Sequence, residues 1–177
     1  LSSLFGIQCS VRNITSANGW SAIVLLCFLA FLPACSTQKG AMVQLEGARP
    51  VIDAANYPSI QAAIDALPDE GGIVQIPPGA FRIDRPLRVY AGDVYLKGSG
   101  SSTHIINEDK TGQPALILSA DTTDLSGKDP LWRVQVSDIR ISGNDNSGHG
   151  ILARYINEIF ITGVTVNYHG KDGIRLD

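Results

Sequence analysis

The chain has 177 residues, of which 44% are hydrophobic and 18% are charged, and its formal net charge is −3. This apolar share excludes a wholly disordered chain, because disordered segments are poor in apolar residues and rich in net charge. The negative net charge provides no basic field for a phosphate backbone, so we expect no nucleic-acid partner.

The first 34 residues contain an apolar segment typical of a targeting signal. Thirteen uncharged residues run from Trp20 to Leu32. This run is shorter than the roughly 20 residues of a membrane-spanning helix, but it suits the apolar core of a signal peptide. The following residues, Leu32-Pro33-Ala34-Cys35-Ser36, resemble the lipobox of bacterial lipoproteins.

The lipobox resemblance implies that residues 1–34 are removed and that Cys35 is lipidated. Acyl chains on Cys35 would anchor the protein to the bacterial cell envelope. The resemblance, with Ser36 after the cysteine, implies the outer membrane or the cell surface. The alternatives are an ordinary signal peptide, which gives a secreted protein, and an N-terminal membrane helix with an incidental cysteine.

The cysteine count agrees with this interpretation. Cys9 and Cys27 precede the expected cleavage site, which leaves Cys35 as the single cysteine of the mature chain. We therefore expect neither an intramolecular disulfide nor a thiolate metal site. Residues 35–50 show no apolar period and are expected to form a tether.

One short helix is predicted between Asn56 and Leu67. Four apolar residues stand at positions i, i+3, i+4 and i+7, which places them on one helical face: Ile60, Ala63, Ile64 and Leu67. Asn56 or Tyr57 is expected at the N-cap, with Pro58 in the first turn. Pro68 and Gly71-Gly72 end the helix.

After the helix, the apolar period becomes that of short strands. The apolar runs span three to five residues and are separated by Gly, Asn, Asp or Ser, which predicts an all-β structure. The runs include Ile73–Ile76, Phe81–Ile83, Leu87–Val89, Val94–Leu96, Ile105-Ile106, Leu116–Leu118, Val134–Val136, Ile139–Ile141, Ile151-Leu152, Ile159–Ile161, Val164–Val166 and Ile174–Leu176.

Internal repeats indicate how the strands are arranged. Ser137–Gly143 recurs 25 residues later as Thr162–Tyr168, and Gly148–Leu152 recurs 23 residues later as Lys171–Arg175. Asp93–Gly98 has the same pattern as Asp138–Gly143, 45 residues apart. Three short strands in each repeat predict a right-handed parallel β-helix. The sequence does not support a leucine-rich repeat, because it has no regular ladder of leucines. It does not support a β-sandwich either, because Asn-Gly hairpin turns are absent between the strands.

Three segments also carry a family resemblance: Tyr57–Asp65, Gly72–Phe81 and Val94–Ile105. Together they resemble the opening of pectate-lyase-superfamily parallel β-helix proteins. The resemblance implies that the helix caps the solenoid and that the Gly72–Phe81 segment belongs to its first coil. It also implies activity on polysaccharides, either by hydrolysis or by elimination at uronic acids. For elimination, the resemblance allows a Ca²⁺ ion as cofactor. Hydrolysis would require two carboxyl groups.

The polar residues of the last two corners form the candidate site. With Ile174 and Leu176 inward, the preceding turn carries His169, Lys171 and Asp172, and the turn one coil earlier carries Asp145 and His149. Because coils stack at the strand spacing, these five side chains are expected to form a cluster that contacts a sugar or Ca²⁺. The alternative is that they are ordinary corner residues, since corners favour Asn, Asp, Gly and His.

Three other polar segments are interpreted as structural. Gly98–Thr103 is expected to be a corner between coils, since it lacks the remaining residues of a phosphate-binding loop. His104 is expected to be a surface turn residue. Ser119–Pro130 is expected to be a solvated insertion.

These features lead to one functional expectation and one alternative. We expect a surface-anchored lyase or hydrolase of uronic-acid-containing glycans, with its main catalytic residues beyond Asp177. Residues 51–177 would then be the cap and first coils of a longer protein, because Asp177 follows directly on a repeat strand. The alternative is a non-catalytic glycan-binding or structural surface β-helix.

Overall fold

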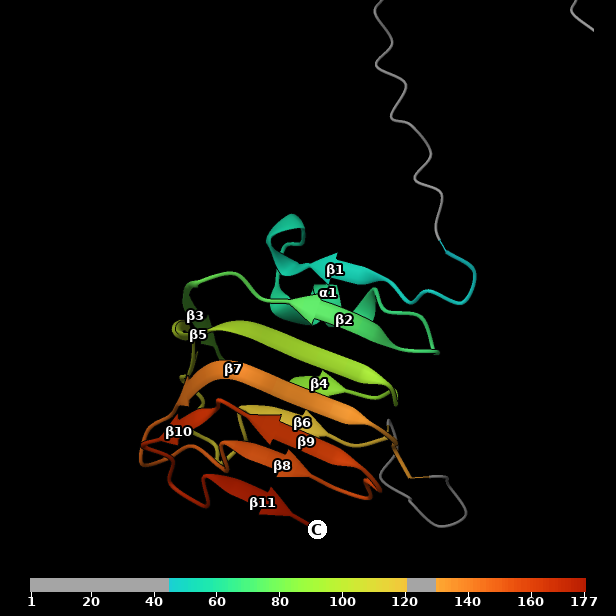
Figure 1. Cartoon of the computed structure of the whole chain (residues 1–177). Coiled ribbons are helices and arrows are strands. Elements are labelled where there is room, and N and C mark those ends of the chain that lie inside the picture. The colour runs from blue at the N-terminus through green and yellow to red at the C-terminus, as the bar shows by residue number, and fades with distance from the viewer. Residues whose placement is uncertain (1–44, 121–129) are drawn as a thin grey trace, which may run out of the picture. The chain divides into compact units, whose positions relative to one another are not determined.

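The computed structural model describes residues 45–120 and 130–177. Within these ranges there are a short 3₁₀-helix, η1 (Ala54–Asn56), one α-helix, α1 (Ile60–Asp65), and strands (Figure 1). The strands are β1 (Val51–Asp53), β2 (Gly72–Gln75), β3 (Gly79–Ile83), β4 (Leu87–Val89), β5 (Val94–Asn107), β6 (Leu116–Leu118), β7 (Val134–Ser142), β8 (Ile151–Ala153), β9 (Ile159–Thr162), β10 (Thr165–Asn167) and β11 (Ile174–Leu176).

Several predictions concern residues outside these ranges. The signal peptide, Cys35 and most of the tether precede residue 45, and most of the Ser119–Pro130 insertion falls between the two ranges. No helix within the described ranges is long and apolar enough to cross a membrane.

The strands form three faces of a parallel solenoid, as the repeats predicted. Face 1 contains β1, β2, the first half of β5, the first half of β7, and β9. Face 2 contains β3, the second halves of β5 and β7, and β10. Face 3 contains β4, β6, β8 and β11. All the pairings are parallel, so the all-β parallel β-helix is confirmed, and successive coils stack one below the other in Figure 1.

The core lies between the three faces. Alternate residues of each strand point inward and stack on the equivalent residues of the next coil. Val74, Leu96 and Val136 stack in this way on face 1 and are at most 1% exposed. Ile105 and Ile141 do so on face 2. Each buried aliphatic side chain contributes about 1.5–3 kcal/mol relative to an exposed one. In the last described coil, the inward positions Ile174 and Leu176 are 42% and 60% exposed.

The predicted helix is present but shorter than expected. Ser59 is its N-cap, and the Ser59 side chain accepts a hydrogen bond from the backbone N–H of Ala62. The Asn56 or Tyr57 cap was therefore wrong: Asn56 ends η1, which Asp53 caps in the same manner. The apolar stripe is confirmed, because the buried residues of α1 are Ile60, Ala63 and Ile64.

The Gly98–Thr103 segment forms the corner between faces 1 and 2. The chain remains extended through it, so β5 is one bent strand rather than two, and the pairing register with β7 shifts between Lys97, Gly100 and His104. The buried hydroxyl of Thr103 holds the bend by bonding to the carbonyl oxygens of Ile76 and Pro77. The segment is therefore a corner, as predicted, but it lies within one coil and not between two coils.

One of the proposed repeats was wrong. Asp93 and Asp138 both have a φ of 56°, and both are followed by residues in strand conformation, which agrees with their similar sequences. However, Asp93 leads into face 1, whereas Asp138 lies within β7 at the bend into face 2. The register therefore pairs Leu96 with Val136 and not with Ile141. The same local motif is used at two different corners of the coil.

Candidate functional site

The structure brings three of the five predicted site residues together. His149 and His169 lie in equivalent corners of the last two coils, and burial together with the charge of His149 lowers the pKa of His169. The Nδ1 atom of His149 is 3.5 Å from Oδ2 of Asp172. Asp145 instead lines a separate hollow with Glu108. Lys171 is exposed and has no hydrogen bond or ion pair to a described residue.

The His169 ring occupies a position that two glycines leave open. A Cβ at Gly143 would lie 2.5 Å from Nδ1 of His169, and a Cβ at Gly150 would lie 3.1 Å from its Cδ2. Nδ1 is 3.2 Å from the hydroxyl of Ser147, whereas Nε2 is buried without a partner among the described residues. This packing makes His169 a structural part of the corner.

Both carboxylates at the end of this cluster face one arginine. Nε of Arg175 donates to Asp177 at 2.6 Å, and its Nη1 lies 3.6 Å from Asp172. The hydrogen bond from Arg175 lowers the pKa of Asp177 and keeps it ionised. A glycosidase needs one carboxyl group that stays protonated as an acid, and Asp177 has the opposite environment.

The described residues contain no group of three or more His, Cys, Asp or Glu side chains placed to hold a metal ion. The Ca²⁺ ion allowed by the family resemblance stays a prediction.

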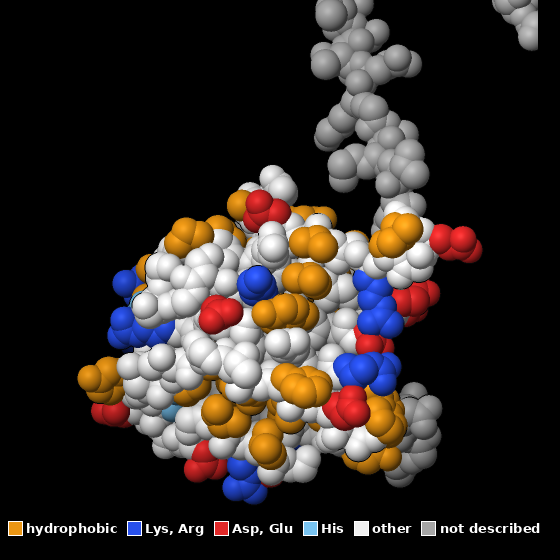
Figure 2. Space-filling view, viewed as in Figure 1, with side chains coloured by type: hydrophobic (Ala, Val, Ile, Leu, Met, Phe, Trp, Pro, Cys, Tyr) orange, Lys and Arg blue, Asp and Glu red, His pale blue; other side chains and the backbone are white. Residues whose placement is uncertain are grey.

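Face 1 presents two columns of outward side chains, each with one residue per coil. The first column is largely apolar and consists of Val51, Ile73, Tyr95, Gln135 and Phe160. The second is polar and consists of Asp53, Gln75, Lys97, Ser137 and Thr162, of which Ser137 is buried. Figure 2 shows apolar side chains recurring down this face, from β1 to β9.

The two columns are connected and partly hollowed. The hydroxyl of Tyr95 is 2.7 Å from that of Ser137, so the ring is held against the next coil. Phe160 is 52% exposed. Asp53, Gln75 and Lys97 line a hollow of about 280 Å³ beside the polar column. An aromatic surface next to hydrogen-bonding groups is suited to ligands that have both apolar and hydroxylated faces.

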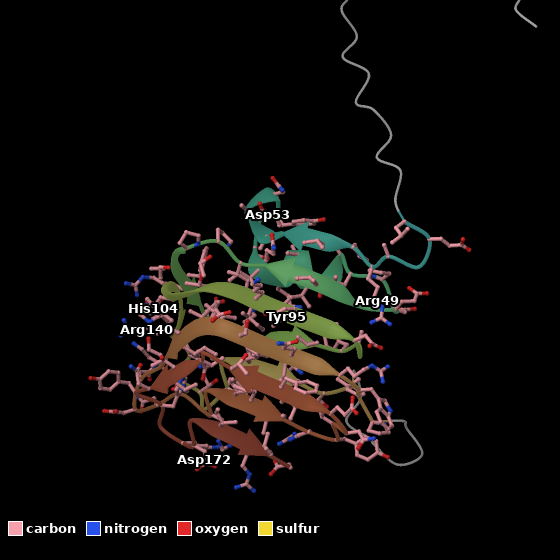
Figure 3. The ribbon with its side chains drawn as sticks, viewed as in Figure 1. Arg49, Asp53, Tyr95, His104, Arg140 and Asp172 are labelled. Atoms are coloured by element: carbon pink, nitrogen blue, oxygen red, sulfur yellow. The ribbon has the colours of Figure 1, made fainter. Side chains whose placement is uncertain are left out.

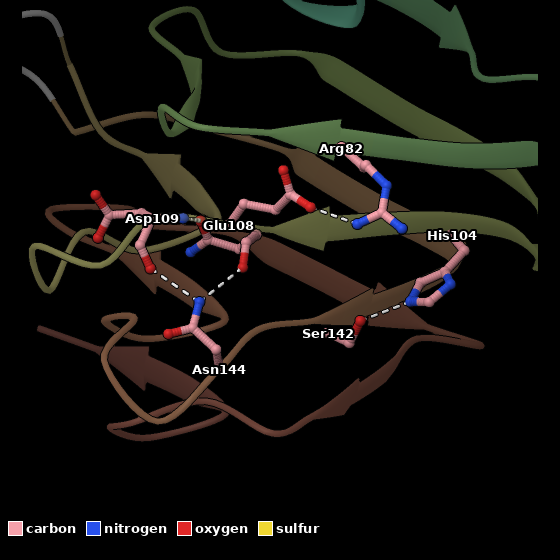
Figure 4. Close-up of polar contacts among 7 residues, drawn as sticks. Arg82, His104, Glu108, Asp109, Ser142 and Asn144 are labelled. Atoms are coloured by element: carbon pink, nitrogen blue, oxygen red, sulfur yellow. Dashed lines mark hydrogen bonds and ion pairs between the residues drawn. The ribbon is translucent and has the colours of Figure 1, made fainter.

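Face 2 carries a basic patch that sequence reasoning missed. His104 and Arg140 are register partners on β5 and β7, and Figure 3 shows them side by side. Nε2 of His104 is 2.6 Å from the hydroxyl of Ser142, and Arg82 on β3 pairs with Glu108 (Figure 4). Burial, reinforced by the charges of Arg140 and Arg82, lowers the pKa of His104.

The prediction that His104 is a turn residue was wrong, because the chain stays in strand conformation after Gly98–Thr103. The signal in the sequence was the alternation after that bend: Thr103, Ile105 and Asn107 are buried, so His104 must face outward from the strand.

A hollow of about 700 Å³ adjoins the basic patch. Ile106, Glu108, Lys110 and Asp145 are among its lining residues. Its wall is held by Asn144, whose Nδ2 donates to the carbonyl oxygens of Asn107 and Asp109 at 3.1 and 2.9 Å (Figure 4). A larger hollow, of about 970 Å³, lies between the start of α1 and strands β3 and β4.

Comparison with known proteins supports the fold and leaves the activity open. Neither a protein-family model nor a curated protein matches the chain. A solved structure from Geobacillus virus E2, named ORF18, is similar with a TM-score of 0.60 and 20% sequence identity. The match covers 67% of this chain and 26% of the viral chain, so this chain spans about a quarter of the viral protein. At this identity the likeness shows the fold alone.

Proposed function

We propose that the chain is part of a glycan-binding β-helix protein of the bacterial cell surface, and that polysaccharide lies along face 1. The observation that carries this proposal is the pair of registered columns on that face. Each coil adds one polar position, and each coil except that of Gln135 adds one apolar or aromatic position, about 4.8 Å from those of the next coil. A linear polymer with repeating hydroxyl groups can use such a periodic surface along its length.

Binding is favoured over catalysis for the described coils. In the cluster predicted from the corners, Asp172 lies near Arg175 and His169 is packed against glycines. The neighbouring Asp177, whose pKa is lowered by its hydrogen bond from Arg175, is a poor proton donor. The face 1 columns require only surface contact and hydrogen bonding.

Polysaccharide binding by Phe160→Ala tests the proposal. We expect a loss of affinity of about two- to tenfold, because an exposed aromatic contact is worth about 0.5–1.5 kcal/mol. Tyr168→Ala is the matched control, since Tyr168 is an aromatic residue that is 75% exposed and lies outside the two columns. Equal affinities for wild type and Phe160→Ala, or equal losses in both variants, would contradict a binding surface on face 1.

Catalysis is the second candidate function, supported by the proximity of His149, His169 and Asp172. If it is correct, the protein releases new reducing ends or ultraviolet-absorbing unsaturated products from pectin or alginate. The double variant His169→Gln, Asp172→Asn would then lose this activity. Full activity in the double variant would exclude the cluster from the chemistry, and no product from any polymer would count against an enzyme.

Cell-surface anchoring through Cys35 is a separate part of the proposal. In cells that are supplied with a radioactive fatty acid, the wild-type protein should become labelled, and Cys35→Ser should abolish this labelling. A label that persists in Cys35→Ser would rule out the lipoprotein interpretation.

A further inference from the structure

We infer that the outward surface of face 2 around Arg140, His104 and Ser142 binds an oxyanion, either a carboxylate or a sulfate group, carried by a polysaccharide. The oxyanion site itself stands on the face 2 geometry. Its attachment to a polysaccharide rests on the proposed function. The site lies around the bend of β5 and β7 from the face 1 columns.

Arg140 is the central group of this site. It is partly exposed on β7, between His104 of β5 and Thr165 of β10 in the pairing register. No described residue accepts a hydrogen bond from its guanidinium or forms an ion pair with it. A guanidinium has five donors in a planar fork, which matches the two oxygens of a carboxylate or sulfate.

The neighbouring groups add donors and leave the positive charge uncompensated. Arg82 is paired with Glu108, so the carboxylate of Glu108 is already engaged and forms no ion pair with Arg140. His104 and Ser142 share one hydrogen bond, which leaves the second ring nitrogen of His104 available to a ligand. An oxyanion placed against Arg140 therefore meets a further donor, and the carboxylate of Glu108 beside it is paired with Arg82.

The surroundings also suit a sugar that carries the anion. Ile106, the register partner of Ser142, lines the 700 Å³ hollow. The hollow provides room for a ring attached to the anionic group, and the polar side chains that line it, among them Asn107, Glu108 and Asn144, offer hydrogen-bond partners for sugar hydroxyl groups.

Binding should strengthen as the pH falls. The charged groups around His104 are Arg82 on β3, Glu108 after β5 and Arg140 on β7, while β10 contributes only neutral side chains. Burial and the two arginines favour the neutral ring in the free protein. An added negative charge favours the imidazolium, and by linkage protonation of His104 favours the anion.

The test compares Arg140→Gln with Arg88→Gln, which removes the same charge from face 3. Binding of the full chain is measured to polygalacturonate and its fully methyl-esterified form, and to dextran sulfate and dextran. We expect Arg140→Gln to weaken binding of a charged polymer by about tenfold or more, as for the loss of one charge-assisted contact. The neutral polymers should be unaffected, and Arg88→Gln should resemble the wild type. The charged polymer that loses affinity identifies the carboxylate or the sulfate as the ligand group.

Equal binding of the charged polymers by the two variants would overturn the inference and leave glycan binding on face 1 intact. If no polymer binds, the proposed function fails, and titration of the His104 ring with sodium sulfate and sodium galacturonate by NMR decides the inference. Saturable shifts in the wild type that vanish in Arg140→Gln support an oxyanion site. Absence of shifts, or equal shifts in both proteins, overturns it.

Discussion

Gln61→Ala is expected to loosen the junction between helix α1 and the first coil. Strand β4 is an edge strand of face 3, and the side-chain amide of Gln61 occupies its free edge. Oε1 of Gln61 accepts from the N–H of Arg88 at 2.8 Å, and Nε2 donates to the carbonyl oxygen of Arg88 at 3.1 Å. The amide thus replaces one pair of the ladder hydrogen bonds that another strand would make.

The magnitude follows from these two bonds. Each neutral hydrogen bond contributes about 0.5–1.5 kcal/mol net, and the freed groups of Arg88 can reach water because the residue is exposed, so we expect a loss of about 1 kcal/mol. Thermal unfolding followed by circular dichroism should show a midpoint lowered by about 3–6 °C. The amide of Arg88 should exchange its hydrogen about fivefold faster, since 1.4 kcal/mol corresponds to roughly a factor of ten.

Asp65→Ala is the control for this prediction. It removes only the 2.7 Å hydrogen bond between Gln61 and Asp65 and leaves both bonds to Arg88 in place. Its Arg88 amide should exchange as in the wild type. If Gln61→Ala leaves the exchange of Arg88 unchanged, or if Asp65→Ala accelerates it equally, the side chain of Gln61 does not close the edge of β4.

Three further predictions concern stability. Hydrogen bonds from two arginines hold the pKa of Asp93 well below its usual range, so its stabilising effect is present above that range and is lost as the pH falls through the lowered pKa. Asp93→Asn should therefore lower the free energy of unfolding in urea by about 1 kcal/mol at neutral pH, and the difference from the wild type should shrink in strong acid. A difference that stays constant with pH would refute the charge effect. Gly98→Ala places a Cβ 2.2 Å from the carbonyl oxygen of Asp138 and should lower the urea midpoint by the equivalent of about 1–3 kcal/mol, whereas an unchanged midpoint would show that the coils can separate there. Because burial lowers the pKa of His169, protonation favours the unfolded chain, and stability should fall as the pH drops below about 6.5. His169→Gln should flatten that dependence, and an equally steep curve would assign it to another group.

The repeat of apolar residues made the coil predictable from sequence. Short alternating runs and the 23- and 25-residue offsets reflect inward residues that must stack on one another, and the register of Ile151 with Ile174 follows that offset. The helix boundaries were less predictable. Asn56 and Ser59 are both good caps, and the choice between them depended on η1, which the 3.6-residue period does not reveal.

The candidate site was less predictable than the fold for a physical reason. Corner residues can be found from local sequence, which is why His149 and His169 were expected to be neighbours. The patch of Arg82, His104 and Arg140 draws on three coils, and its register depends on the bend and register shift after Lys97. A one-residue difference in such a bend exchanges inward and outward positions, so the side chains that share a face are known only when the bend is known.

The bent strands β5 and β7 have a consequence for ligands longer than one face. Each strand runs without interruption through both faces. Tyr95 and Gln135 of the first face 1 column are therefore carried by the same two strands as His104 and Arg140 of the basic patch. Once a polymer chain is bound to the face 1 columns, its binding to the basic patch of face 2 is an intramolecular step. Two weak binding surfaces joined in this way bind a flexible polymer that can bend from face 1 to face 2 more tightly than a stiff polymer that cannot.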